Sequence, residues 1–247
     1  MPHVGTSVPE AIAARMTDMA RNLPDTDWHV DRLYDFVADL DASVIAATHS
    51  RYVIDLNRAP DHRPLYPGSS ETGLCPSTTF DDRAIYRDGQ ALEEAEIAER
   101  RERYWRPYHQ RLQEQLVAIT ASHGAVVLWE AHSIRSRVPR FFQGRLPDLS
   151  IGTGGGVSAA PALIARLKAV AAESAGYSHV VDGRFKGGYI TRAYGNPAAG
   201  VHAVQLELAQ ATYMDEEPPY DFREDLAERI RPVLRRLLDA ALSWLRG

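Results

Sequence analysis

Three side chains of the types that bind catalytic metal ions lie far apart along this chain. His3 lies in the small-residue turn Pro2–Thr6, Asp27 opens an expected helix, and His132 follows an apolar run. Two imidazoles and one carboxylate are the ligands of many catalytic zinc ions, and they leave a fourth position for water. The chain has nine histidines, which allow many such sets, so a surface or packing role is the alternative for each of them.

A carboxylate inside an apolar segment indicates acid–base chemistry. Glu207 lies near the C-terminal end of the apolar segment Val204–Leu208. Burying an ionised carboxylate is costly unless the group is paired or its pKa is raised. A carboxylate of raised pKa beside a water molecule on a metal ion would suit a general base. A structural ion pair between Glu207 and an arginine is the alternative, and the sequence does not decide between the two.

Several positively charged side chains could hold an anionic ligand. Of the 28 basic residues only Lys168 and Lys186 are lysines, and codon bias is a sufficient explanation of that excess of arginine. A guanidinium nevertheless grips a carboxylate at two points, which a lysine cannot do. The segment Asp55–Arg58 therefore offers a possible clamp, and Lys186 lies beside Gly187–Gly188, where backbone can approach a ligand closely. The alternative for each of these charges is a solvated position in a loop.

Motifs of several common enzyme classes are absent from the sequence. No Gly-x-Ser-x-Gly, P-loop or His-Glu-x-x-His pattern occurs. The segment Gly152–Gly156 lacks the spacing of the dinucleotide fingerprint and follows an expected loop instead of a strand. Serine hydrolase, dehydrogenase and kinase activities are therefore disfavoured, and a nucleotide-binding module built on Gly152–Gly156 is a distant alternative.

The composition is close to the average of soluble globular domains, with 45% hydrophobic and 25% charged residues in a chain of 247. No apolar run reaches the ~20 residues that cross a bilayer, and no signal-peptide pattern follows Met1, which predicts a cytoplasmic protein without a membrane partner. The net charge of −5 without a basic stripe predicts no nucleic-acid partner. The single cysteine, Cys75, excludes an intrachain disulfide and a cysteine-rich zinc module.

The candidate residues need a scaffold, and the apolar patterns alternate between strands and helices. Strands are expected at short apolar runs, namely 42–47, 125–129, 177–181 and 201–208. Helices are expected at 8–21, from 27 onward, at 93–122 with a kink or break at Pro107, at 160–175 and at 221–245. Long irregular stretches are expected at 55–79 and 135–158.

Such an alternation predicts an α/β sandwich with a mostly parallel sheet. Ligands of these sheets bind beyond the carboxyl ends of the strands. Three polar clusters follow expected strands in this way, at 49–58, at 130–133 and at Glu207. We therefore expect residues from these clusters to meet at one edge of the sheet.

Nine segments, in order along nearly the whole chain, resemble one enzyme family. They are Pro2–Thr6, Thr26–Trp28, Ser50–Arg58, Leu65–Gly68, Tyr104–His109, Ala131–Ser136, Gly144–Leu149, Gly183–Arg192 and Gln205–Glu207. Together they are similar to the N-formylglutamate amidohydrolase (N-formylglutamate deformylase) family, which resembles a branch of the zinc-exopeptidase fold. The resemblance implies one amidohydrolase domain over residues 1–247, built as a three-layer α/β sandwich around a mixed, mostly parallel sheet.

The resemblance also implies a site with one Zn²⁺ ion. The ion would be held by His3, Asp27 and His132, with Asp31, one helical turn later, as the alternative to Asp27. Glu207 would be the general base. The groups that would bind the substrate are Asn57, Arg58, Lys186 and Arg192.

The activity that the resemblance implies is hydrolysis of N-formyl-L-glutamate to formate and L-glutamate in histidine degradation. The expected partner is a small anionic N-acyl amino acid, and the sequence leaves the oligomeric state open. Two alternatives are a deacylase or carboxypeptidase-like hydrolase of another N-acyl amino acid, and a catalytically impaired binding homologue. Four features depart from the family pattern. Glu130 and Asp182 replace the usual aspartate and asparagine, and Ser150 stands where asparagine is common. His3 lies almost at the start of the chain, so that either the start codon is placed too late or this ligand lies on an unanchored end that would weaken metal binding.

Overall fold

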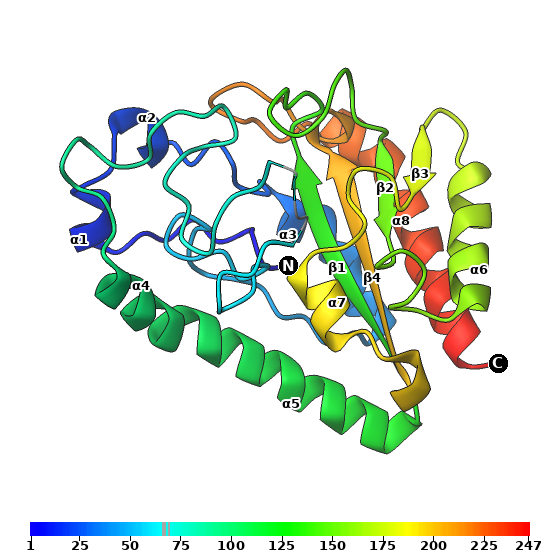
Figure 1. The fold of residues 1–247 in the computed structure, drawn as a ribbon. Coiled ribbons are helices and arrows are strands. Elements are labelled where there is room, and N and C mark those ends of the chain that lie inside the picture. The colour runs from blue at the N-terminus through cyan, green and yellow to red at the C-terminus, as the bar shows by residue number, and fades with distance from the viewer. Residues whose placement is uncertain (66–67, 69) are drawn as a thin grey trace.

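The computed structural model describes residues 1–65, 68 and 70–247, and its centre is a four-stranded sheet (Figure 1). The strands are β1 (Val126–Ile134), β2 (Leu149–Gly152), β3 (His179–Val181) and β4 (Val201–Ala209), in the order β1-β4-β2-β3. β1 and β4 are parallel along their whole length, β2 and β3 are parallel, and β2 is antiparallel to β4. The predicted α/β class with a mixed, mostly parallel sheet is confirmed.

Helices cover both faces of the sheet, which gives three layers. Helices α6 (Pro161–Ala172) and α8 (Glu224–Leu245) pack together on one face, and α5 (Arg106–His123) and α7 (Tyr189–Tyr194) lie against the other (Figure 1). Because side chains alternate along a strand, each strand serves both layers. On β4, Val204, Leu206 and Leu208 join the core under α6 and α8. On β1, Val126 and Leu128 join the cluster under α5 and α7.

Most of the long periodic segments form the predicted elements, with shifted ends. α6, α8, β3 and β4 lie at the predicted positions, and β1 extends past Trp129 to Ile134. The predicted long helix forms α4 (Glu94–Arg100), a π-helical turn Arg101–Trp105 and α5. Pro107 lies in the first turn of α5, where its missing N–H group costs no hydrogen bond. The helix therefore continues through Pro107, and its irregular turn lies just before it, at Arg101–Trp105.

Several predictions of local structure in the first half of the chain are wrong. Residues 42–47 form no strand, because they pair only with the N-terminal residues and leave Val44 53% exposed. The predicted helix 8–21 is two short helices, α1 (Glu10–Ala13) and α2 (Asp18–Arg21). The second predicted helix begins after Asp27, as α3 (Val30–Leu33) followed by the 3-10 helix Asp35–Leu40.

The predicted irregular stretch 135–158 contains β2, and His132 lies inside β1 rather than after a strand. Two further 3-10 turns, Pro197–Ala199 and Gln210–Thr212, flank β4. The described residues of 55–79 contain no helix or strand, as predicted, while Tyr66 and Pro67 of the family segment Leu65–Gly68 lie outside the described residues. Within the part of the chain that the structure describes, no helix combines the length and apolar character needed to span a membrane.

Candidate metal centre

His3, Asp27 and His132 meet at one buried point. One ligand atom from each residue lies within 4.8 Å of the other two. The Oδ2 atom of Asp27 lies 3.0 Å from Nδ1 of His132 and 3.7 Å from Nδ1 of His3. All three side chains are buried, with at most 4% of their surface exposed. Residues separated by more than a hundred positions thus offer two nitrogens and one oxygen to a common centre.

Backbone contacts fix His3 although it is close to the start of the chain. The amino group of Met1 donates a hydrogen bond to the carbonyl of Ile45 (2.9 Å), and the amide of Ala47 donates to the carbonyl of Met1 (2.9 Å). The amide of Asp27 donates to the carbonyl of His3 (3.1 Å). The alternative of an unanchored end is therefore wrong, because residues 45–47 hold this end of the chain.

Each histidine is held by its far ring nitrogen. Nε2 of His3 lies 2.7 Å from Oδ1 of Asp55. Nε2 of His132 lies 3.4 Å from Oε2 of Glu130 and 3.2 Å from Nδ2 of Asn57. A carboxylate on the far nitrogen of a histidine fixes the ring orientation and leaves the near nitrogen as a metal ligand. Glu130, whose other oxygen accepts a hydrogen bond from Thr191, occupies this position beside His132.

The donor set fits a divalent cation. Nδ1 of His3 is buried, and no described residue gives it a hydrogen-bond partner. Four buried carboxylates, Asp27, Asp55, Glu130 and Glu207, surround the two imidazoles. Uncompensated buried charge is costly, and a cation at this point would offset it.

Asp27 is ionised in this environment. Burial by itself raises the pKa of its carboxyl group, but the charge of Arg51, the hydrogen bond from His132 and the nearby imidazole of His3 outweigh that effect and hold the pKa well below its usual range. Nη2 of Arg51 donates to Oδ1 of Asp27 at 3.0 Å, which leaves Oδ2 facing the histidines. Asp31 is exposed on α3 and lies outside the cluster, so the geometry favours Asp27 as the carboxylate of this site.

The β1–β4 register places Glu207 directly beside His132. The two residues are aligned in the parallel pair, and Glu130 is aligned with Gln205 in the same way. All four side chains fall on the sheet face covered by α5 and α7, because they alternate with the core residues of the other face. Gln205 was not predicted, yet its spacing of two from Glu207 within an apolar strand is the pattern that could have found it.

Glu207 is poised to exchange a proton near neutral pH. Burial raises the pKa of its carboxyl group to about 7, against the opposing effect of positive charge on His132 and Arg51. Its Oε2 accepts a hydrogen bond from Nε2 of Gln205 (3.1 Å), and Oε1 of Gln205 accepts one from the amide of Gly188 (2.7 Å). These two hydrogen bonds hold the Glu207 carboxylate at the wall of the cavity. A pKa near 7 would suit a general base.

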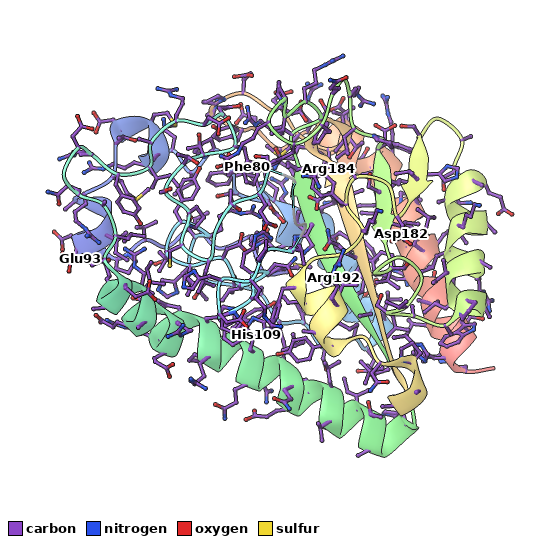
Figure 2. All side chains as sticks on the ribbon, in the orientation of Figure 1. Phe80, Glu93, His109, Asp182, Arg184 and Arg192 are labelled. Atoms are coloured by element: carbon purple, nitrogen blue, oxygen red, sulfur yellow. The ribbon has the colours of Figure 1, made fainter. Side chains whose placement is uncertain are left out.

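A cavity of about 70 Å³ opens beside the group formed by His3, Asp27 and His132, near the carboxyl ends of β1 and β4. His3, His132 and Glu207 line it together with three arginines, Arg51, Arg58 and Arg184. Its apolar lining includes Phe80, Ile134, Phe141 and Phe185. Figure 2 shows Phe80 and Arg184 near this end of the strands. Arg184 was not singled out from the sequence, although it lies in the family segment Gly183–Arg192.

Asn57 and Arg58 also line the cavity. Oδ1 of Asn57 accepts from the amide of Ile190 (2.8 Å), which turns Nδ2 toward His132. A Cβ atom on Gly188 would lie 2.2 Å from that Nδ2 atom, so this position requires glycine. Arg58 is tied by its Nε to the carbonyl of Thr72 (2.8 Å) and is half-buried.

Lys186 and Arg192 lie elsewhere. Both side chains are exposed, and neither is among the described residues that line the cavity. Nε of Arg192 donates to the carbonyl of Gly187 (3.0 Å), on the α7 side seen in Figure 2. The structure therefore brings Asn57 and Arg58, but not these two residues, to the cavity that His3 and His132 line.

Backbone amides of the glycine segment 152–156 already hydrogen-bond to a carboxylate of the same protein. The Asp182 carboxylate accepts hydrogen bonds from the amides of Thr153 (2.7 Å) and Gly155 (3.3 Å). A phosphate bound by this loop would need those same amides. An internal carboxylate at this position disfavours the nucleotide-binding alternative.

The comparisons with known proteins agree with one another. The sequence model of the N-formylglutamate amidohydrolases matches residues 1–214. N-formylglutamate deformylase of Pseudomonas aeruginosa is 55% identical over 99% of this chain and 91% of its own length, and that of Pseudomonas putida is 51% identical over the same shares. The crystal structure of N-formylglutamate amidohydrolase from Ralstonia eutropha JMP134 superposes with a TM-score of 0.83 at 28% identity, over 99% of this chain and 92% of that one. A gene product of Agrobacterium tumefaciens shares the fold, with a TM-score of 0.74 at 19% identity over 99% of this chain and 89% of that one.

Proposed function

The chain belongs to the N-formylglutamate amidohydrolase family, and we propose that it hydrolyses N-formyl-L-glutamate to formate and L-glutamate, as a step of histidine degradation. The names of its Pseudomonas relatives support this substrate. The observation that carries the proposal is the buried group of His3, Asp27 and His132 beside a cavity that His3, His132 and Glu207 line together. No other reaction class is needed to explain those four groups.

We propose further that His3, Asp27 and His132 would hold one Zn²⁺ ion. When bound, the ion supplies Lewis acidity, which polarises the formyl carbonyl and makes water acidic enough to lose a proton near neutral pH. Two nitrogen ligands, one oxygen ligand and a position left open for water are typical of catalytic zinc sites. Asp55 and Glu130 keep the two rings turned toward this centre through their far nitrogens.

Glu207 is the proposed proton carrier. Its raised pKa allows the carboxylate to accept the proton of the attacking water and, as a carboxylic acid, to return a proton to the departing amine nitrogen. The C–N bond of the formamide breaks as the C–O bond to the water oxygen forms. The hydrogen bond from Gln205 keeps the carboxylate in place for both transfers.

Arg58, with Asn57 beside it, is the proposed group that binds the α-carboxylate of the substrate. Its position on the same segment as Asp55, which contacts His3, keeps the bound carboxylate close to the metal cluster. Orientation of a bound substrate against the reacting groups can supply roughly 7–11 kcal/mol of the activation barrier in favourable cases. An anionic N-acyl amino acid is therefore the substrate class that this cavity fits.

Metal analysis combined with a formate-release assay tests the proposal. The purified protein should contain about one zinc ion per chain, lose formate release when the metal is chelated, and regain it when Zn²⁺ is added back. Rates on N-formyl-L-glutamate, N-acetyl-L-aspartate and short peptides should favour the first, which would separate this activity from a general deacylase or carboxypeptidase.

The matched variant is Glu207→Gln. It keeps the shape of the side chain and leaves the three metal ligands untouched, so it should retain the zinc content of the wild type and lose at least about 100-fold in kcat, the usual contribution of a general base. A Glu207→Gln protein with wild-type turnover would remove Glu207 from the mechanism. A wild-type protein that stays equally active after complete metal removal would contradict metal dependence.

A further inference from the structure

We infer that three side chains of one helical stretch are positioning residues, which fix Arg58 at the wall of the cavity by holding the backbone around it. They are Arg101, Trp105 and His109, called here the donor row, and each donates a hydrogen bond to a carbonyl of the segment 56–60. The inference rests on the proposed function, because it takes Arg58 as a group that binds the substrate. The segment forms no helix or strand, so other elements have to hold its backbone in place.

The donor row lies along one side of its helix. Its members are four residues apart, on the π-helical turn and the first turn of α5. Side chains at this spacing are neighbours on a helix surface, and the rings of Trp105 and His109 stack with their centroids 3.7 Å apart. The acceptors are every second carbonyl of the segment, taken in the opposite direction: Nη1 of Arg101 donates to Pro60 (2.9 Å), Nε1 of Trp105 to Arg58 (3.0 Å) and Nε2 of His109 to Leu56 (2.8 Å). One side of the helix therefore holds the segment at three regularly spaced points.

The hydrogen bond from His109 has a fixed direction. A carbonyl can only accept, so Nε2 carries the proton that is shared with Leu56. Burial lowers the pKa of the imidazole to about 4, so the ring is neutral at pH 7 and its Nδ1 atom is an acceptor. The hydroxyl group of Tyr194, on α7, donates to that Nδ1 atom at 2.9 Å. His109 is thereby oriented from both sides as a neutral donor to the segment.

The carbonyls of Leu56 and Arg58, which the donor row holds, lie on either side of Asn57. Asp55 holds the same turn from the other side, since its carboxylate accepts from the amide of Asn57 (2.8 Å) and its carbonyl accepts from the amide of Arg58 (3.2 Å). The carboxylate of Asp55 also contacts His3. The turn that carries Arg58 is thus fixed between His3 and the helix. Loss of a donor from the row would let the backbone of Arg58 move relative to the cavity.

The test removes one donor and follows KM and kcat of the zinc-loaded protein for N-formyl-L-glutamate. Trp105→Phe keeps an aromatic ring beside His109 and removes the N–H group. Its KM should rise about 3- to 10-fold, the contribution of one hydrogen bond. Its kcat should stay within about twofold, because the lost binding is common to the bound substrate and the transition state. His109→Phe should behave in the same way, whereas His109→Gln, whose amide both donates and accepts, should keep KM within about twofold of the wild type.

A double substitution separates the positioning of Arg58 from general support of the fold. Arg58→Gln removes the guanidinium, so the backbone that Trp105 holds no longer carries the binding group. The KM of Arg58→Gln with Trp105→Phe should therefore lie within about twofold of the KM of Arg58→Gln alone. Two substitutions that act independently would multiply their effects on KM. That outcome would overturn the inference, and so would a wild-type KM in Trp105→Phe.

Two further variants keep the test decisive if a buried change disturbs folding. Arg101 is not part of the buried core, and Arg101→Ala should raise KM about threefold through loss of its hydrogen bond. Trp129→Phe is the matched control, because it removes an indole N–H that donates to Tyr34 (3.3 Å) in the core under α6 and α8. It should leave KM and kcat unchanged. An equal rise of KM in Trp129→Phe would assign the effect to the fold in general and overturn the inference.

Backbone hydrogen exchange separates failure of the inference from failure of the proposed function. The amides of residues 56–59 should exchange at least about threefold faster in Trp105→Phe than in the wild type, because the segment has lost one of its attachments. A wild type that releases no formate, together with this faster exchange in the variant, would refute the proposed function and keep the positioning role. Unchanged exchange in Trp105→Phe would refute the positioning role whatever the activity.

Discussion

Replacement of Asp55 by asparagine should weaken binding of the proposed Zn²⁺ ion without disturbing the side chains of His3, Asp27 and His132. Asp55 is fully buried, and its Oδ1 atom accepts hydrogen bonds from Nε2 of His3 (2.7 Å) and from the amide of Asn57 (2.8 Å). Both partners are donors, so the oxygen of an asparagine side chain would take the same place. The variant therefore keeps the orientation of the His3 ring and removes the negative charge behind it.

The expected loss of zinc affinity depends on whether the variant removes only the charge of Asp55 or its hydrogen bond to His3 as well. Removing the group that holds the far nitrogen of a metal-binding histidine typically lowers metal affinity by about 10- to 100-fold. That range corresponds to about 1.4–2.8 kcal/mol of binding free energy. Because Asp55→Asn preserves the hydrogen bond, we expect the lower half of the range, and Asp55→Ala should reach the upper half.

The assay is competition for Zn²⁺ between the metal-free protein and a chelator of known affinity, at fixed pH. Unfolding by urea, measured on the metal-free proteins, corrects for any loss of stability caused by the new buried amide. Asp88→Asn, at an exposed position, is the matched control and should bind zinc as the wild type does. A zinc affinity of Asp55→Asn within twofold of the wild type would refute the argument that the Asp55 charge strengthens His3 as a ligand.

Two more changes probe the surroundings of the site. Gly188→Ala would put a Cβ atom 2.2 Å from Nδ2 of Asn57 and so displace that amide. Overpacking of this kind should lower the free energy of unfolding, measured by urea titration, by about 1–3 kcal/mol, and kcat should fall as well. Wild-type values of both quantities would contradict the described packing. His109 is buried, and burial lowers the pKa of its imidazole to about 4, partly offset by its hydrogen bond to the carbonyl of Leu56. Because an unfolded histidine has a pKa near 6.5, the unfolded chain binds a proton at this residue before the folded protein does. The free energy of unfolding therefore falls as the pH falls from 6.5 toward 4, and urea unfolding should show a loss of about 2 kcal/mol between pH 7.5 and 5. The His109→Gln protein should not show that loss.

The sequence alone determined the elements whose character is local. The apolar runs of β1 and β4 and the 3.6-residue periodicity of α8 are sufficient signals, because each element buries a face set by its own spacing. The position of Glu207 in an apolar strand also marked it as a buried carboxylate before any packing was known. Local patterns failed at residues 42–47, whose backbone hydrogen-bonds to Met1 rather than to a strand of the sheet.

The site itself was decided by tertiary structure. The ligand types of His3, Asp27 and His132 are visible in the sequence, but their meeting depends on a turn near the chain start, a loop before α3 and the middle of β1. Only the strand register aligns His132 with Glu207, since a slip of one residue would turn either side chain to the opposite face. Arg184 reaches the cavity through long-range contacts with the carbonyls of Phe141 and Ser70, which no local periodicity encodes. Short-range spacing thus determined which face a side chain takes, and long-range packing determined which side chains share a cavity.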